Sequence, residues 1–95
     1  GIIVGADSAI DFNDGIIKGN TVTGTDDQAQ IYIKGDENNI QNNIVRINSG
    51  TAAYGLWIVE GNNNFVINND LLNAGYSNNF VDDGTGTVTT AGNRT

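Results

Sequence analysis

The acidic residues Asp36, Glu37 and Glu60 are the side chains of this sequence whose type and spacing could carry out chemistry. Two carboxyl groups about 5–9.5 Å apart can hydrolyse a glycosidic bond if the pKa of one is raised so that it acts as the acid. The sequence has no histidine, which excludes centres that depend on imidazole. We interpret the neighbouring pairs Asp26–Asp27 and Asp82–Asp83 as solvated corners, because adjacent strand residues point to opposite faces. We predict no metal site and no cofactor.

Two aromatic residues form the second candidate site. In the apolar segments IYIK and LWIV, alternation sends Tyr32, Lys34 and Trp57 outward and the isoleucines inward. Tyr32 and Trp57 are separated by about one repeat of roughly 25 residues, so we expect them on one exposed face. Such a pair binds either a sugar ring or another protein surface, and the sequence does not separate the two. Tyr54 and Tyr76 lie near glycine turns, where we expect local packing.

These residues must be positioned by a repeat of short strands. Three segments share the pattern Ile, any residue, Gly or Asn, Asn or Asp, any residue, Val or Leu; they are IKGNTV from Ile17, IQNNIV from Ile40 and INNDLL from Ile67. A second series, IIVG, IYIKG, LWIVEG and FVDDG, lies between them. Both series recur about every 25 residues, a period typical of β-solenoids. Helix is disfavoured because glycine and asparagine are frequent and no helical apolar periodicity persists.

Asparagine pairs such as those in ENNIQNNIV and GNNNFVINND accompany this repeat. Asparagines stacked on one another can form ladders of amide hydrogen bonds, and asparagine also tolerates the left-handed backbone of a sharp corner. We therefore predict that the sixteen asparagines serve mainly corners and ladders.

The segments IIKGNTVTG, NNIQNNIV and NNNFVINNDL resemble repeats of the right-handed parallel β-helix, the pectin-lyase-like superfamily. This resemblance implies an all-β solenoid of about three to four coils, but it does not fix an activity, because the superfamily includes lyases, glycosidases, epimerases and inert scaffolds. The closing stretch VDDGTGTVTTAGNRT resembles the ends of β-helices in bacteriophage and prophage tail-spike and neck-appendage proteins.

Composition and net charge exclude several classes of binding partner. The 95 residues are predicted to form one domain, 1–95, and the absence of methionine leads us to expect a part of a longer protein. A net charge of −7 with only four cations argues against binding to nucleic acid. No apolar run reaches the length of a membrane span. The chain has no cysteine, so thiol chemistry is excluded.

We therefore expect a non-catalytic structural or glycan-binding segment, similar to the β-helical parts of tail spikes and located on a virion or at an extracellular surface. Its expected partners are sister chains in a homotrimer, flanking domains or a surface polysaccharide. The alternative is part of a polysaccharide-degrading glycosidase that uses Asp or Glu pairs. An ice-binding solenoid is disfavoured because the threonines do not form a recurring flat array.

The same alternation predicts which side chains fill the core. The residues expected to point inward are Ile17, Val22, Ile31, Ile33, Ile40, Val45, Leu56, Ile58, Ile67, Leu72 and Phe80.

Overall fold

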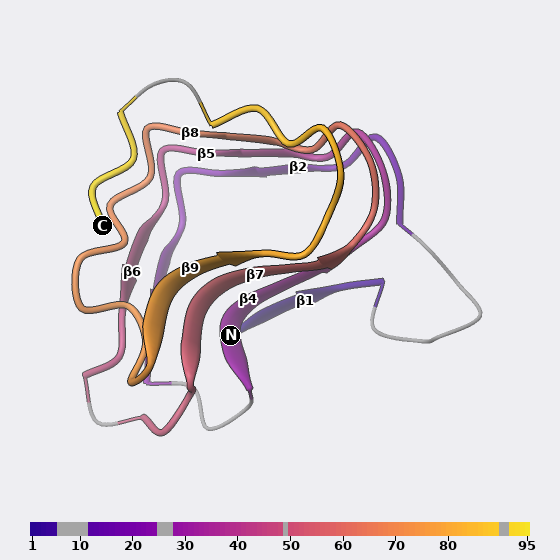
Figure 1. The fold of residues 1–95 in the computed structure, drawn as a ribbon. Coiled ribbons are helices and arrows are strands. Elements are labelled where there is room, and N and C mark those ends of the chain that lie inside the picture. The colour runs from indigo at the N-terminus through magenta and orange to yellow at the C-terminus, as the bar shows by residue number, and fades with distance from the viewer. Residues whose placement is uncertain (6–11, 25–27, 49, 90–91) are drawn as a thin grey trace.

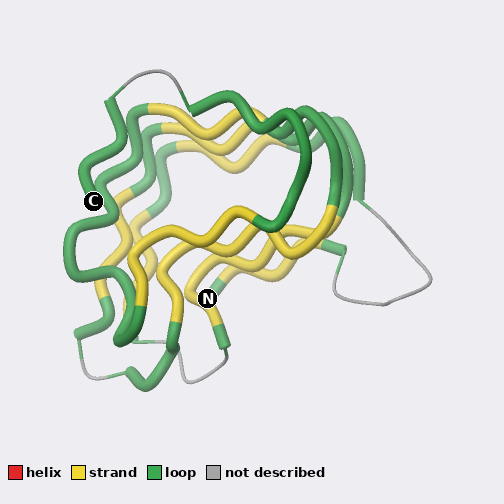
Figure 2. Tube along the Cα trace, in the orientation of Figure 1, coloured by secondary structure: helices red, strands yellow, loops and turns green. Residues whose placement is uncertain are grey.

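The computed structural model describes residues 1–5, 12–24, 28–48, 50–89 and 92–95, and within these ranges the chain is all-β without a helix (Figure 2). The nine strands form three parallel sheets. Sheet A contains β1 (Ile2–Val4), β4 (Ala29–Lys34), β7 (Tyr54–Glu60) and β9 (Asn78–Asp82). Sheet B contains β2 (Ile16–Lys18), β5 (Asn39–Gln41) and β8 (Phe65–Ile67). Sheet C contains β3 (Thr21–Thr23) and β6 (Ile44–Arg46).

The chain passes through sheets A, B and C in that order and then returns to sheet A beside its own earlier strand (Figure 1). We call one such passage a circuit. Like residues face like residues between circuits: Ile17 pairs with Ile40, and Ile31 pairs with Leu56. Isolated bridges continue this pairing beyond β9, where Thr85, Val88 and Arg94 pair with Asn62, Phe65 and Asp70 of the preceding circuit. The predicted stacking of segments about 25 residues apart is therefore confirmed.

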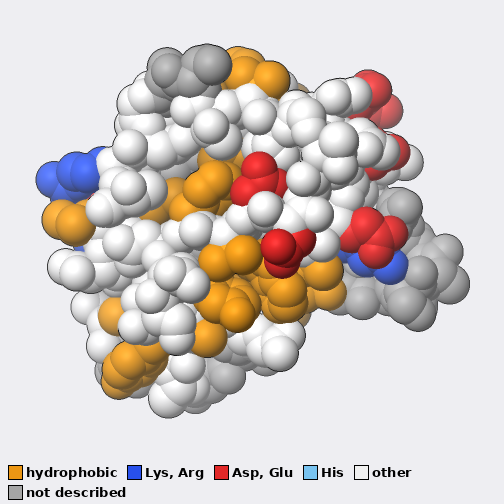
Figure 3. Space-filling model, in the orientation of Figure 1, with side chains coloured by type: hydrophobic (Ala, Val, Ile, Leu, Met, Phe, Trp, Pro, Cys, Tyr) orange, Lys and Arg blue, Asp and Glu red, His pale blue; other side chains and the backbone are white. Residues whose placement is uncertain are grey.

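The core lies between the three sheets. Strands β2 and β3 each bury only their middle residue, the pattern of a strand with one face on the core and one on solvent. The buried cluster consists of Ile17, Val22, Ile31, Ile33, Ile40, Val45, Leu56, Ile58, Val66, Leu71 and Ala74, with Ile2 and Phe80 packed against it. Figure 3 views the face that β9 borders, where apolar side chains gather in the middle among acidic ones.

Two of the predicted core residues are wrong by one position. Val66 and Leu71 are fully buried, whereas Ile67 is half-buried and Leu72 is 37% exposed. The repeat of the third circuit therefore reads VINNDL and not INNDLL. The position of the repeat is fixed by the buried side chain of Asn69. Leu71 enters the core two residues after it, as Val45 does two residues after the buried Asn43.

Candidate functional site

A row of four non-polar side chains crosses the outer face of sheet A. Ile3 pairs with Tyr32, Tyr32 with Trp57, and Trp57 with Val81, so the four residues stand in register across the four strands. The rings of Tyr32 and Trp57 meet edge to face with centroids 5.5 Å apart. The prediction that these two residues share one face is confirmed, and both remain partly exposed. We call this set the outer row.

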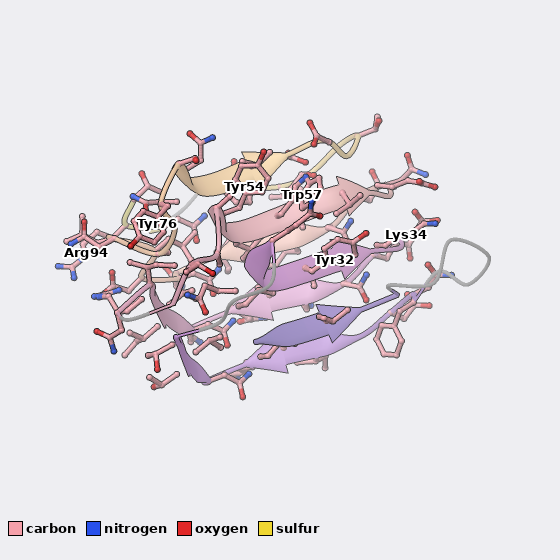
Figure 4. The ribbon with its side chains drawn as sticks, turned by 90° about the horizontal axis from the view of Figure 1, so that it is seen from below. Tyr32, Lys34, Tyr54, Trp57, Tyr76 and Arg94 are labelled. Atoms are coloured by element: carbon pink, nitrogen blue, oxygen red, sulfur yellow. The ribbon has the colours of Figure 1, made fainter. Side chains whose placement is uncertain are left out.

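Tyr54 joins the outer row as a third ring. Its centroid lies 5.1 Å from that of Trp57, again at a steep interplanar angle. Figure 4 shows Tyr32, Tyr54 and Trp57 together on one face, which we call the aromatic cluster. We had expected Tyr54 to pack locally at a turn, but it is the first residue of β7. Tyr76 also differs from its expected packing: it is 72% exposed and lies away from the cluster.

Asp83 holds the tryptophan in place. The indole Nε1 of Trp57 donates a hydrogen bond of 2.8 Å to Asp83 Oδ2. Asp83 follows directly after β9, one circuit beyond Trp57, and sequence reasoning had interpreted it only as a solvated corner. The signal that could have identified it is the spacing, since this residue stands one repeat after the tryptophan.

Lys34 does not lie on the exposed face as we had predicted. Its side chain is only 9% exposed, and its Nζ is 4.0 Å from Glu60 Oε2. The pairing of β4 with β7 shifts after Ile33, so that Lys34 stands opposite Glu60 and Val59 becomes an extra residue. Such a bulge re-aims the side chains that follow it, which a strict alternation of inward and outward residues does not anticipate.

The three candidate acidic residues, Asp36, Glu37 and Glu60, each make a different contact near the ends of β4 and β7. Asp36 Oδ1 accepts a hydrogen bond of 2.7 Å from the backbone N–H of Asn62, and the Asp36 N–H donates to Asn13 Oδ1. Asp36 therefore faces Asn62, two residues beyond Glu60. Glu37 is exposed at a corner with a φ of 58°.

The other predicted acidic pairs add no metal centre. Asp26–Asp27 lies outside the described residues. Asp82 Oδ1 accepts hydrogen bonds from Gly84 N–H and from the Thr87 hydroxyl, which ties a turn. Within the described ranges, no group of three or more Asp or Glu side chains could hold a metal ion.

Two rows of asparagines run along the corners and confirm the predicted ladders; the buried members are Asn38, Asn43, Asn64 and Asn69. Ladder 1 links Gly15, Asn38 and Asn64, and ladder 2 links Asn20, Asn43, Asn69 and Asn93. The bridge between Phe65 and Val88 places Thr87 at the position that follows Asn64 in ladder 1. In ladder 2 the backbone N–H and the side-chain Nδ2 of each asparagine both donate to Oδ1 of the next, at 2.9–3.1 Å. Each inner Nδ2 also donates to a backbone carbonyl, so the buried amides are satisfied.

The residue before each ladder position has a left-handed backbone. Before ladder 2 these residues are Gly19, Asn42, Asn68 and Gly92, with φ between 53° and 75°. Before ladder 1 they are Asp14, Glu37, Asn63 and Gly86, with φ between 56° and 68°. Asparagine and glycine adopt this conformation at low cost, which explains the asparagine pairs: the first turns the corner and the second enters the ladder.

An ion cluster lies beside ladder 2 on sheet C. Arg46 Nη2 donates to Asp70 Oδ2 at 2.7 Å, while Arg94 Nε and Nη2 donate to Oδ1 and Oδ2 at 2.9 and 2.8 Å. The hydrogen bond from Arg46, followed by those from Arg94, holds the pKa of Asp70 well below its usual range. Two of the four cations of the chain are thus engaged by one carboxylate.

No protein-family model, curated protein or solved structure matches this chain. In the part of the chain that the structure describes, no helix is long and apolar enough to cross a membrane.

Proposed function

We propose that the chain is a right-handed parallel β-helix and a non-catalytic structural segment, whose sheet A packs with its outer row against another protein surface. Three observations support the β-helix: the repeated order of the sheets, the in-register pairing between circuits, and the two asparagine ladders. The right-handed winding is part of the proposal and is the hand expected of connections between parallel strands. The resemblance to the β-helical parts of tail spikes belongs to the proposal as well.

The outer row is the observation that carries the structural role. Ile3 is 51% exposed, and Tyr32, Trp57 and Val81 are partly exposed beside it. A contiguous non-polar row of this kind on a small acidic protein is typical of a surface that another protein covers. Tyrosine and tryptophan are enriched at such surfaces because they combine a large apolar ring with a polar edge.

The acidic residues support a structural role over a catalytic one. Asp36 accepts the backbone N–H of Asn62, Asp83 accepts the indole N–H of Trp57, and Glu60 stands opposite Lys34. Each carboxylate therefore joins two neighbouring circuits. The rings of the aromatic cluster also meet at 81° and 69°, so they do not form the flat platform on which a sugar chain would lie.

A glycan titration tests this proposal against its two rivals. Trp57 is the sole tryptophan, so its fluorescence reports on the aromatic cluster. We expect no saturable change in emission with neutral or acidic bacterial polysaccharides, and no release of reducing ends. A saturable change would replace the proposed role with glycan binding. Release of reducing ends that is lost in the Asp36→Asn and Glu60→Gln variants would replace it with a glycosidase.

A further inference from the structure

We propose that the surface covering the outer row is a basic polypeptide segment, in which Arg or Lys side chains accompany apolar ones. This inference rests on the proposed structural role and adds the chemistry of the partner. It follows from the position of every cation in the chain and from two carboxylates, Asp83 beside Trp57 and Glu60 at the end of β7.

The outer face of sheet A presents none of the chain's four cations to solvent. Lys34 lies on this sheet but is 9% exposed beside Glu60. Arg46 and Arg94 are bound to Asp70 on sheet C. Lys18 is exposed on β2, which belongs to sheet B. The exposed face therefore offers a partner the non-polar outer row and acidic groups, without a cation from the chain.

Asp83 supplies a negative charge at the aromatic cluster itself, and Glu60 supplies a second one at the end of β7, three residues after Trp57. The Glu60 side chain is 65% exposed even though it stands opposite Lys34. The Asp83 carboxylate is fixed against the indole N–H of Trp57 by the 2.8 Å hydrogen bond. A guanidinium or ammonium group over the tryptophan would meet both the ring face and a carboxylate, and cation–π contacts of this kind contribute about 0.5–2 kcal/mol.

A second copy of the chain is a poor occupant for the same face. Each copy carries a net charge of −7, so two copies repel each other at low salt. In a second copy, Lys34 is buried and Arg46 and Arg94 are bound to Asp70, which leaves Lys18, on sheet B, as the one exposed cation that could pair with Glu60 or Asp83. Charge complementarity therefore favours a different, basic chain over the sister chains of a homotrimer.

The test uses two synthetic peptides of equal length, one alternating Arg and Val and the other alternating Glu and Val. Trp57 emission is titrated with each peptide, and sedimentation of the protein alone is measured in parallel. We expect the Arg peptide to shift the emission saturably, the Glu peptide to leave it unchanged, and the affinity to fall about tenfold with added salt.

Charge-neutralising variants locate the binding site. The double variant Glu60→Gln with Asp83→Asn keeps the shape of both side chains, and the new amide oxygen can still accept from Trp57 Nε1. We expect it to weaken binding of the Arg peptide about tenfold. The Glu37→Gln variant removes one exposed charge at the corner after β4, outside the contact between Asp83 and Trp57, and is expected to change the affinity by about twofold or less.

Failure to bind the Arg peptide, equal binding of both peptides, or equal losses in the Glu37 and Glu60/Asp83 variants would each overturn the basic partner. Association of the protein with itself in the absence of peptide would assign the face to a second copy. Those results leave the structural role standing, whereas a saturable response to polysaccharide removes that role. The two failures are therefore distinguishable.

Discussion

The two asparagine ladders occupy neighbouring corners of the same core, yet they are built differently. Ladder 2 has an asparagine in every circuit, at positions 20, 43, 69 and 93. Ladder 1 has only Asn38 and Asn64, with Gly15 before them and Thr87 after them. As a result the side chain of Asn43 takes part in four hydrogen bonds, whereas that of Asn64 takes part in three.

The shorter ladder shows which part of the arrangement the backbone supplies by itself. Gly15 N–H still bonds to Asn38 Oδ1, and Val88 N–H bonds to the Asn64 carbonyl, so the circuits stay in register without a terminal amide. Gly15 has no side chain because a Cβ there would collide with the Phe12 ring. The amides therefore satisfy buried polar groups between circuits more than they define the path of the chain.

The largest expected effect comes from breaking the longer ladder at its centre with Asn69→Asp. Asn69 is 1% exposed, and its Nδ2 donates to Asn93 Oδ1 and to the Ile40 carbonyl. A carboxylate has the same shape but cannot donate, so a buried charge would face two oxygens. We expect a loss of about 3–5 kcal/mol in the free energy of unfolding at neutral pH, measured by urea titration with circular dichroism.

The matched control for this charge change is Asn63→Asp, at an exposed corner with a φ of 56°. Aspartate tolerates that conformation and stays solvated, so we expect a change of about 0.5 kcal/mol or less. Equal losses in the Asn69 and Asn63 variants would mean that net charge, and not the ladder, limits stability.

The shorter ladder can be extended with Thr87→Asn. The new amide oxygen would lie where Asn93 Oδ1 lies in ladder 2 and would accept from the backbone N–H and Nδ2 of Asn64. We expect the new hydrogen bonds to raise the free energy of unfolding by about 0.5–1.5 kcal/mol. The loss of the exposed hydrogen bond from the Thr87 hydroxyl to Asp82 reduces this gain. Thr87→Ala removes that hydroxyl alone and serves as the control. A Thr87→Asn variant no more stable than Thr87→Ala would show that ladder 1 cannot be continued at this level.

Sequence reasoning predicted the ladders because a spacing pattern is enough to place like residues together. It placed the third circuit one residue out of frame because Val66 and Ile67, and likewise Leu71 and Leu72, are adjacent apolar residues that fit the pattern equally well. What decides between them is three-dimensional: Asn68 turns the corner, so Asn69 points inward and Leu71 follows it into the core. Alignment of the pair Asn68–Asn69 with Asn42–Asn43 would have indicated the correct frame, but the pattern was aligned on isoleucine.

The candidate site was predictable where strands alternate regularly and not elsewhere. Tyr32 and Trp57 meet because both strands keep strict alternation up to Ile33 and Ile58. Lys34 departs from its predicted exposure because the register shifts between Ile33 and Lys34, and the glycines that follow, Gly35 and Gly61, fit an ordinary strand end equally well. Asp83 depends on the position of a strand end, which sequence patterns locate least well.

A smaller change in stability is expected from substitutions at the corner residues that precede the two ladders. The corners before ladder 2 use only Gly and Asn, but the corner before Asn38 uses Glu37 with a φ of 58°. A glutamate in this conformation is strained, whereas glycine is not. We expect Glu37→Gly to raise the free energy of unfolding by about 0.5–1 kcal/mol after the larger entropy of the unfolded glycine is subtracted.

Asn63→Gly is the matched control for the Glu37 variant, because asparagine already adopts this backbone at low cost. Its free energy of unfolding is expected to change by only about 0.3 kcal/mol. Urea titrations of the two variants give the comparison. A Glu37→Gly protein less stable than the parent would show that the Glu37 side chain makes a favourable contribution at the corner.

The smallest change in stability is expected from the ion cluster of Arg46, Asp70 and Arg94, which, unlike the neutral ladder beside it, depends on pH. Asp70 follows Asn69, and Arg94 follows Asn93, so one pair of circuits is joined by a buried amide contact and by an exposed carboxylate–guanidinium contact. The pKa of Asp70 is lowered by Arg46 and Arg94, so the folded protein binds the proton less readily than the unfolded chain. The stability contributed by Asp70 is thus fully present above about pH 4, the unfolded value, and is lost as the pH falls toward the lower folded pKa.

Asp70→Asn should therefore lower the stability at neutral pH and flatten its decline in acid relative to the parent protein. Urea titrations across this pH range measure both slopes. The ladder amides do not titrate, so they hold the circuits together throughout. An acid decline equally steep in the Asp70→Asn variant and the parent protein would show that the two arginines do not stabilise the fold through this carboxylate. The contacts between these circuits would then be attributable to the uncharged ladder alone.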